Sequence, residues 1–169
     1  MAAEGDEAPP AGRSAVQWLG ELCHRALERW DFHGGAEQAK PLIVDVAAGM
    51  GARARVPAAM AERAVEMLGR FAATEAASDL GRAEILGREV PLLARVGDRI
   101  VSARADILFR LDGRLVVGDY KLAKHPNVPP EAAGIYTGAA TAALGEASVF
   151  ATISIGSGEI AYHGRAEGR

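Results

Sequence analysis

The chain has 169 residues, of which 49% are apolar and 24% are charged, and its formal net charge is −3. This length and balance fit one folded domain whose core is large enough to need no disulfide or metal for stability. The single cysteine, Cys23, excludes an internal disulfide, a four-cysteine zinc site and an iron–sulfur cluster held by cysteines. No apolar run is long enough to span a bilayer, and the first residues lack the order of a signal peptide, so we expect a soluble, cytoplasmic protein with no membrane partner.

Basic charge is concentrated in the middle of the chain. Residues 82–124 carry nine basic and six acidic side chains, although the chain as a whole is acidic. The chain lacks the bulk positive charge of a protein that binds nucleic acid strongly on its own. Any binding to DNA is therefore expected to be weak without a partner that delivers the substrate.

The N-terminal part is predicted to be a tail followed by helices. Residues 1–13 are rich in Ala, Gly, Pro and acidic residues and are expected to form a flexible tail. Ser14 and Gln17 have the spacing of a capping box, and apolar residues recur at helical intervals from Ala15 to Trp30. His24 lies off the apolar stripe, on the polar face of this predicted helix.

The pattern changes along the rest of the chain. Residues 42–47 fit either a strand or the start of a helix, and a further helix is predicted to begin near Pro57. After Gly81 the alternation of apolar residues predicts strands, with one helix between them. The predicted strands are Glu89–Leu93, Ile100–Leu111, Arg114–Lys121, Val149–Ile155 and Glu159–His163, and the helix is Glu131–Leu144. This order indicates a layered α/β or α+β domain, which we place at residues 14–165.

A two-residue turn at Asp112-Gly113 fixes the register of the second and third predicted strands. With Leu111 opposite Arg114, counting back places Asp106 directly opposite Asp119. Paired residues of this kind have Cβ atoms about 4.5–5.5 Å apart, so the two carboxylates would repel each other. A divalent cation bound by both would compensate for the repulsion.

Lys121 lies two residues after Asp119, so alternation puts both on the same face of the strand. A lysine beside two metal-binding acids could orient water or stabilise charge that develops on a phosphorus centre. A simpler arrangement is also open, in which Asp106 faces solvent and Asp119 pairs with Lys121 or Arg104. An unrelated metal-binding or small-ligand domain would leave the two carboxylates pointing apart.

The segment Val117-Gly-Asp-Tyr-Lys121, preceded by Asp106, resembles the PD-(D/E)XK nuclease motif. The resemblance is nearest to the nuclease domain at the C-terminus of RecB/AddA-type helicase–nucleases. Further similar pieces occur in the same order, namely Leu22-Cys-His24-Arg-Ala-Leu-Glu28, Trp30-Asp-Phe32, Glu89-Val-Pro91 and Ala105-Asp106-Ile107. The resemblance implies a restriction-endonuclease-like α/β fold, in which helices flank a mixed central sheet and a helical segment precedes it.

The resemblance also implies roles for individual residues. Asp106 and Asp119 would be the central metal ligands, with His24, Glu89 and the backbone carbonyl of Tyr120 completing the set. Lys121 would be the catalytic lysine, and Mg²⁺, with Mn²⁺ as an alternative, would be the cofactor. The ring of Tyr120 points to the opposite face of the strand from Lys121 and is expected to pack in the core.

Two features depart from the family pattern. The helix after the lysine strand lacks the usual Gln, and Tyr136 could stand in for the aromatic residue that contacts DNA. Leu122 follows the lysine where the family often has Thr.

The resemblance implies a Mg²⁺-dependent deoxyribonuclease, acting as an exonuclease on DNA ends or single strands in double-strand-break repair and recombination. No P-loop sequence is present, so the partner would be a helicase acting in cis or in trans. The alternative is a catalytically inactive domain of the same fold that binds DNA or assembles a complex.

Overall fold

A computed structural model describes residues 14–50, 56–96, 98–125 and 127–163. The predicted tail, residues 1–13, and positions 164 and 165 of the predicted domain lie outside the described residues. The described helices are α1 Ala15–Leu27, α2 Ala39–Gly49, α3 Ala58–Phe71, α4 Glu75–Arg82 and α5 Pro130–Leu144, with a short 3-10 turn at Ala36–Gln38. The strands are β1 Glu84–Val96, β2 Arg99–Leu111, β3 Arg114–Lys121, β4 Ser148–Ser154 and β5 Glu159–His163.

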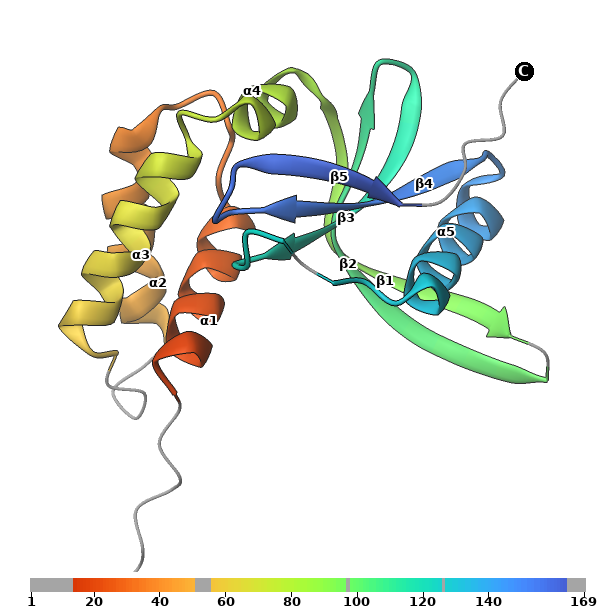
Figure 1. Cartoon of the computed structure of the whole chain (residues 1–169), viewed down its shortest axis with the longest axis horizontal. Coiled ribbons are helices and arrows are strands. Elements are labelled where there is room, and N and C mark those ends of the chain that lie inside the picture. The colour runs from red at the N-terminus through yellow and green to blue at the C-terminus, as the bar shows by residue number, and fades with distance from the viewer. Residues whose placement is uncertain (1–13, 51–55, 97, 126, 164–169) are drawn as a thin grey trace, which may run out of the picture.

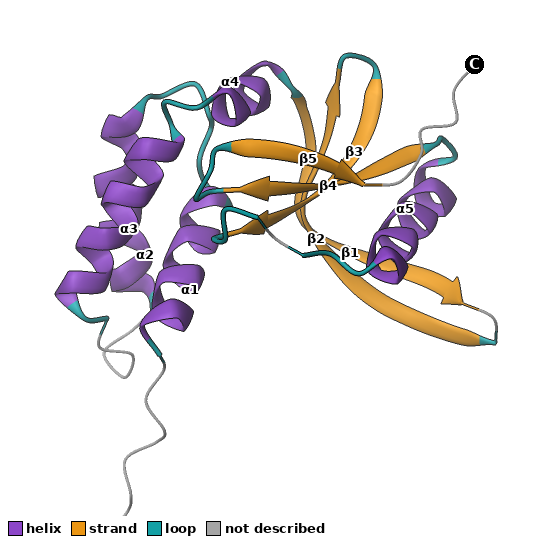
Figure 2. Cartoon of the chain, in the orientation of Figure 1, coloured by secondary structure: helices purple, strands orange, loops and turns teal. Residues whose placement is uncertain are grey.

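The strands form one mixed sheet in the order β1-β2-β3-β4-β5 (Figure 1). β3 and β4 are parallel and are joined through α5, whereas the other neighbouring pairs are antiparallel. The helices α1 to α4 precede the sheet in the chain, and α1 to α3 gather at one end of it while α5 lies at the other (Figure 2). This is the helix-flanked mixed α/β sheet expected of a restriction-endonuclease-like fold, with the predicted N-terminal helical segment.

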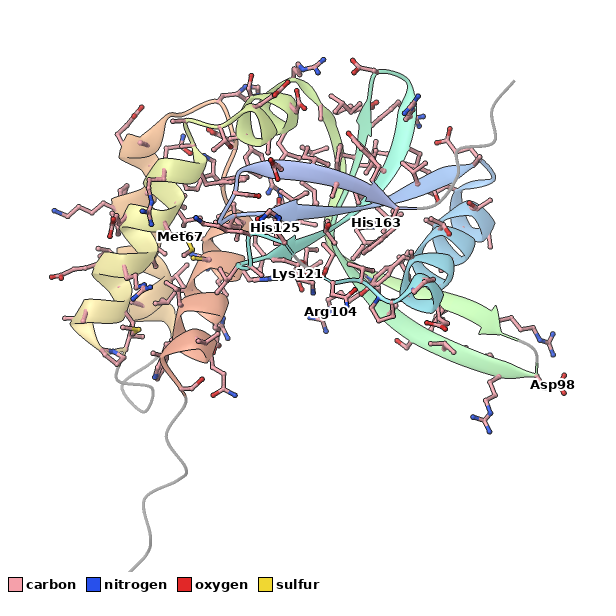
Figure 3. The ribbon with its side chains drawn as sticks, in the orientation of Figure 1. Met67, Asp98, Arg104, Lys121, His125 and His163 are labelled. Atoms are coloured by element: carbon pink, nitrogen blue, oxygen red, sulfur yellow. The ribbon has the colours of Figure 1, made fainter. Side chains whose placement is uncertain are left out.

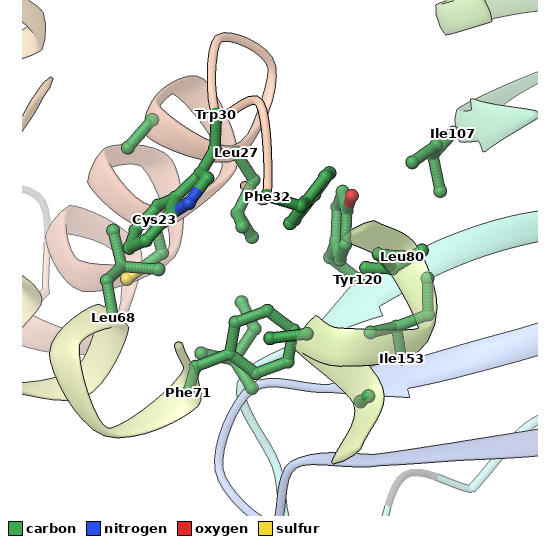
Figure 4. Packing of buried hydrophobic residues seen from close by; sticks show 14 of the residues in the cluster. Cys23, Leu27, Trp30, Phe32, Leu68, Phe71, Leu80, Ile107, Tyr120 and Ile153 are labelled. Carbon is green, nitrogen blue, oxygen red and sulfur yellow. The ribbon is translucent and has the colours of Figure 1, made fainter. Parts of the chain in front are cut away.

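Two apolar clusters hold the sheet between its helices. The larger cluster joins α1 to α4 to one face of the sheet, and Trp30, Phe71 and Tyr120 are among its buried aromatic residues (Figure 4). The smaller cluster packs α5 against the other face through residues such as Val117 and Phe150. Alternate residues of β3 divide between the clusters, because successive side chains of a strand point to opposite faces.

Local sequence signals account for several element ends. The Ser14 hydroxyl accepts a hydrogen bond from the Gln17 N–H, and the Gln17 side chain accepts one from the Ser14 N–H, so the predicted capping box is confirmed. Asp112 and Gly113 have φ values of 49° and 77°, as a two-residue hairpin turn requires, and Leu111 pairs with Arg114 as predicted.

The remaining predicted bounds are confirmed in part. The first helix ends at Leu27 instead of continuing to Trp30, whose indole N–H donates to the Gly34 carbonyl in the following loop. The helix predicted to begin near Pro57 is confirmed as α3, which starts at Ala58 with Pro57 at its N-cap. Residues 42–47, for which a strand and a helix start were both open, lie inside a helix, α2. The helix α4 was not predicted, and β1 begins five residues before Glu89.

Within the described part of the chain, no helix combines the length and apolar character needed to cross a membrane.

Candidate active site

Three neighbouring strands bring acidic residues to one level of the sheet. The β2–β3 pairing ends at Ile107 and Gly118, so the next position in register brings Asp106 opposite Asp119. The β1–β2 pairing continues through this level and brings Glu89 opposite Asp106 on its other side. The predicted register of Asp106 and Asp119 therefore agrees with the observed hairpin.

Asp106 is the centre of this arrangement. Its Oδ2 accepts a hydrogen bond of 2.6 Å from the Tyr120 N–H and lies 3.5 Å from His24 Nδ1 on α1. Burial raises the pKa of Asp106 to about 6, and the charges of Asp119 and Glu89 act in the same direction. His24 and the Tyr120 N–H oppose the increase without cancelling it. The site thus keeps a carboxylate in a place that disfavours its negative charge.

Asp119 and Lys121 form a close pair at the end of β3. The Lys121 Nζ is 2.6 Å from Asp119 Oδ2, and the Asp119 side chain is only 13% exposed. Burial disfavours the charged lysine, but the hydrogen bond and the charge of Asp119, together with the charge of Asp106, outweigh it and raise the pKa of Lys121. Lys121 is therefore an ammonium group at neutral pH. The pairing of Asp119 with Lys121, left open by the sequence, is present.

Glu89 occupies a strained backbone position. Its φ of 51° lies in the left-handed region, which is uncommon for a residue other than glycine inside a strand. Its carboxylate is 3.1 Å from an Arg104 guanidinium nitrogen, so Arg104 pairs with Glu89 and not with Asp119. Backbone strain of this kind occurs most often at functional positions.

A cavity of about 630 Å³ lies between α1 and the β1–β2 strands. His24, Glu89, Arg104 and Asp106 all line it. The wall formed by α1 and the turn after it also carries four charged residues that were not predicted to take part in the site: Glu21, Arg25, Glu28 and Arg29. They share helical spacing with His24, which is the one local signal that could have grouped them. Burial and the charge of Glu89 raise the pKa of Glu28, so this wall is part of the same electrostatic environment.

The two tyrosines have different surroundings. Tyr120 is 2% exposed, as predicted for a core side chain, and its ring meets His24 edge to face at 6.0 Å between centroids. This contact fixes the histidine beside Asp106. Tyr136 on α5 stacks on Phe150 at 4.9 Å. Burial raises the pKa of Tyr136, and the charges of Asp119 and Asp106 add to the effect.

The donor set suits a hard divalent cation, because it combines carboxylate oxygens with one imidazole. The negative charges that raise the pKa of Asp106 are those that a cation would compensate. In the part of the chain that the structure describes, however, no group of three or more His, Cys, Asp or Glu side chains is arranged to hold a metal ion. Asp119 is paired with Lys121, and Glu89 is paired with Arg104.

The fold is a helix-flanked mixed sheet that brings two acids and a lysine together at the end of β3. The family model of the PD-(D/E)XK nuclease superfamily matches residues 2–151, which is most of the chain. The chain therefore belongs to the PD-(D/E)XK nuclease superfamily, whose members typically use divalent metals. No curated protein matches the chain.

Proposed function

We propose that the protein is a Mg²⁺-dependent deoxyribonuclease that hydrolyses phosphodiester bonds at the site around Asp106. The observation that carries the proposal is the convergence of Asp106, Asp119 and Lys121 at one strand end, with His24 brought in from α1. A structural role alone would not favour a buried carboxylate beside two other acids, because their mutual repulsion costs stability.

The chain offers five groups that could hold Mg²⁺ or Mn²⁺. These are the side chains of His24, Glu89, Asp106 and Asp119, and the backbone carbonyl of Tyr120. Binding would require Asp119 and Glu89 to exchange their present partners, Lys121 and Arg104, for the metal. A divalent metal in this position would polarise the phosphodiester and lower the pKa of a bound water.

Lys121 is suited to act on the reacting atoms once Asp119 is engaged elsewhere. Released from this pair, its ammonium group can orient the attacking water and stabilise negative charge on the phosphorus oxygens. Arg104 would be freed in the same way, and it lines the cavity beside Asp106. Two cations that are paired internally would thus become available to the substrate.

The finer role follows from the resemblance to RecB/AddA-type nuclease domains. We propose exonuclease action on DNA ends or single strands in repair and recombination, with a helicase in cis or in trans that delivers the strand. The acidic net charge supports delivery by a partner, since the chain has little general attraction for DNA. Tyr136 is the proposed aromatic contact to DNA.

A second function is favoured by a specific observation. Asp119 and Glu89 are each neutralised by a cation of the chain itself, and α5 lacks the Gln of the family pattern. A domain of this kind could bind DNA or assemble a complex without cleaving.

The test is degradation of labelled single- and double-stranded DNA by the full chain with Mg²⁺ or Mn²⁺, with EDTA as a control. We expect cleavage that EDTA abolishes and that falls at least about 100-fold in Lys121→Ala, because a preorganised charge at the reacting centre is removed. Lys40→Ala, an exposed lysine on α2, is the matched control and should cleave normally.

Calorimetric titration with Mn²⁺ separates the remaining outcomes. Mn²⁺ binding that is lost in Asp119→Ala, without cleavage by any protein, would support the non-cleaving function or a need for the helicase. If the chain shows no cleavage and binds no metal, the proposed site is overturned.

A further inference from the structure

A second cavity lies beside the strand end that carries Lys121, and the proposed reaction does not use it. Its volume is about 520 Å³, and it is formed by α3, the segment after β3 and the turn between β4 and β5. The described residues that line it include three cationic side chains, Arg63, Arg70 and Lys124, and no acidic one. This balance favours an anionic ligand.

The two arginines come from one face of α3. Arg63, Met67 and Arg70 are spaced four and three residues apart, which places them on the same side of a helix. Met67 lies on the side of α3 that faces the sheet (Figure 3). Arg70 is 3.5 Å from Glu66, but both side chains are about two-thirds exposed, so the pair is weak and can be exchanged for a ligand.

The opposite wall is a turn fixed to the end of β3. The Ile155 N–H donates to the Lys121 carbonyl at 2.8 Å, and the Gly158 N–H donates to the Ser154 carbonyl at 2.8 Å. A Cβ on Gly156 would lie 2.5 Å from the Leu122 carbonyl oxygen, so the two segments are in direct contact only because this residue is glycine. The wall is therefore preorganised and is connected through backbone to the proposed catalytic lysine.

Ser157 in this turn carries an unused donor. Its Oγ is buried and has no hydrogen-bond partner among the described residues, while its own N–H donates to Ser154 Oγ at 3.0 Å. A buried hydroxyl without a partner costs stability unless a ligand supplies one. The same residue lines the cavity with the three cations.

We propose that this cavity binds a phosphate group of the nucleic-acid substrate, at a position away from the phosphodiester that is cleaved. Arg63, Arg70 and Lys124 neutralise the phosphate, and the Ser157 hydroxyl donates to one of its oxygens. The chemistry recognised is a phosphate oxyanion, and its assignment to nucleic acid rests on the proposed function. The site gives a chain of acidic net charge a local means of holding its substrate strand.

The test measures binding of a fluorescent single-stranded oligonucleotide at several salt concentrations, in EDTA and in the Lys121→Ala background. The double variant Arg63→Gln with Arg70→Gln keeps good helix formers on α3, so it is expected to fold. We expect its affinity to fall roughly tenfold and the slope of log K against log salt to decrease by up to about 0.7, the contribution of one phosphate contact on a single strand.

Ser157→Ala separates the hydroxyl from the charges. The backbone hydrogen bonds of the turn do not use the Ser157 Oγ, so the turn is kept. Its affinity should fall several-fold with an unchanged salt slope, because a neutral donor releases no counterion. Arg114→Gln, at the opposite end of β3, is the matched control and should change neither quantity.

The outcomes distinguish this site from the proposed nuclease function. Oligonucleotide binding that is equal in the double variant and its Lys121→Ala parent, or reduced equally by Arg114→Gln, overturns the site and leaves cleavage by the unaltered chain as a separate question. If the unaltered chain neither binds nor cleaves nucleic acid, the protein is titrated with inorganic phosphate. The shifts of the amide NMR signals of residues 156–158 then show whether the cavity binds phosphate. Shifts that the double variant abolishes would support a site for free phosphate and overturn the nucleic-acid assignment, and no shift would overturn the site altogether.

Discussion

The buried carboxylate of Asp106 lowers the free energy of unfolding of the chain. Its carboxylate is buried, and Asp119 and Glu89 oppose its charge further, so its pKa of about 6 lies above the ordinary value of 3.8. Between these pH values the folded chain binds a proton that the unfolded chain releases. The free energy of unfolding therefore falls as the pH rises from about 4 to 6 and levels off above the folded pKa.

We predict that Asp106→Asn removes this loss of stability. The amide oxygen can still accept the Tyr120 N–H, but no buried charge forms at high pH. At pH 8 and without metal, the variant should be more stable than the unaltered chain by roughly 2 kcal/mol, with little difference at pH 4. Urea unfolding at pH values from 4 to 8 measures this difference. Asp45→Asn, on the exposed face of α2, is the control.

Addition of a metal ion gives a second test of the role of Asp106. A ligand that binds only the folded state raises the free energy of unfolding, so Mn²⁺ at pH 8 should stabilise the unaltered chain and not Asp106→Asn. Parallel pH profiles for the two proteins would contradict the assigned burial cost.

At the scale of elements, β3 depends on a glycine that carries no chemistry. A Cβ on Gly118 would lie 2.6 Å from Ile107 Cγ2 and 3.0 Å from Ile153 Cδ1. Side chains of the two neighbouring strands thus fill the space above Gly118, and they hold β3 in the register that sets Asp119 opposite Asp106.

Gly118→Ala should therefore destabilise the chain by about 1–3 kcal/mol, the usual cost of overpacking a core. Thermal unfolding measures the change. Gly134→Ala on α5 is the matched control, because a Cβ there meets nothing within 4 Å and alanine favours a helix, so its stability should rise by up to about 1 kcal/mol. Equal effects of the two substitutions would show that the packing over Gly118 yields easily.

The elements that the sequence predicts well are those defined by local signals. The hairpin follows from the backbone preferences of Asp112 and Gly113, and the start of α1 follows from Ser14. The early start of β1 was missed because the pairing with β2 shifts between Ile85 and Gly87, which breaks the alternation. The helix α4 was missed because it has only eight residues.

The candidate site divides in the same way. The opposition of Asp106 and Asp119 can be counted from a short hairpin. The approach of His24 to Asp106 joins positions 82 residues apart, and no local pattern predicts it without the family resemblance. The pairing of Glu89 with Arg104, and the cavity beside α3, arise from packing between segments far apart in the chain.

At the scale of the whole molecule, Arg88 links the helical layer to the sheet. It extends from β1 and donates to the carbonyls of Leu27 at 2.5 Å and Trp30 at 2.6 Å, where α1 ends. Its guanidinium also lies 5.1 Å from the ring centre of Phe32. These contacts satisfy the Leu27 carbonyl at the last residue of α1 and the Trp30 carbonyl in the following loop, and they tie the end of α1 to the sheet that carries Asp106.

We predict that Arg88→Met lowers the free energy of unfolding by about 2–3 kcal/mol, because two partly buried carbonyls lose a charged donor. Mn²⁺ affinity should fall as well, since His24 is no longer held against Asp106. Arg88→Lys should restore part of the stability but less of the Mn²⁺ affinity, because a single ammonium cannot donate to both carbonyls in the planar geometry of arginine.

Arg95→Met, an exposed position on the same strand, should change the free energy of unfolding by less than about 0.5 kcal/mol. Loss of stability in Arg88→Met with full Mn²⁺ affinity would mean that the sheet alone positions the metal site and that α1 is dispensable for it.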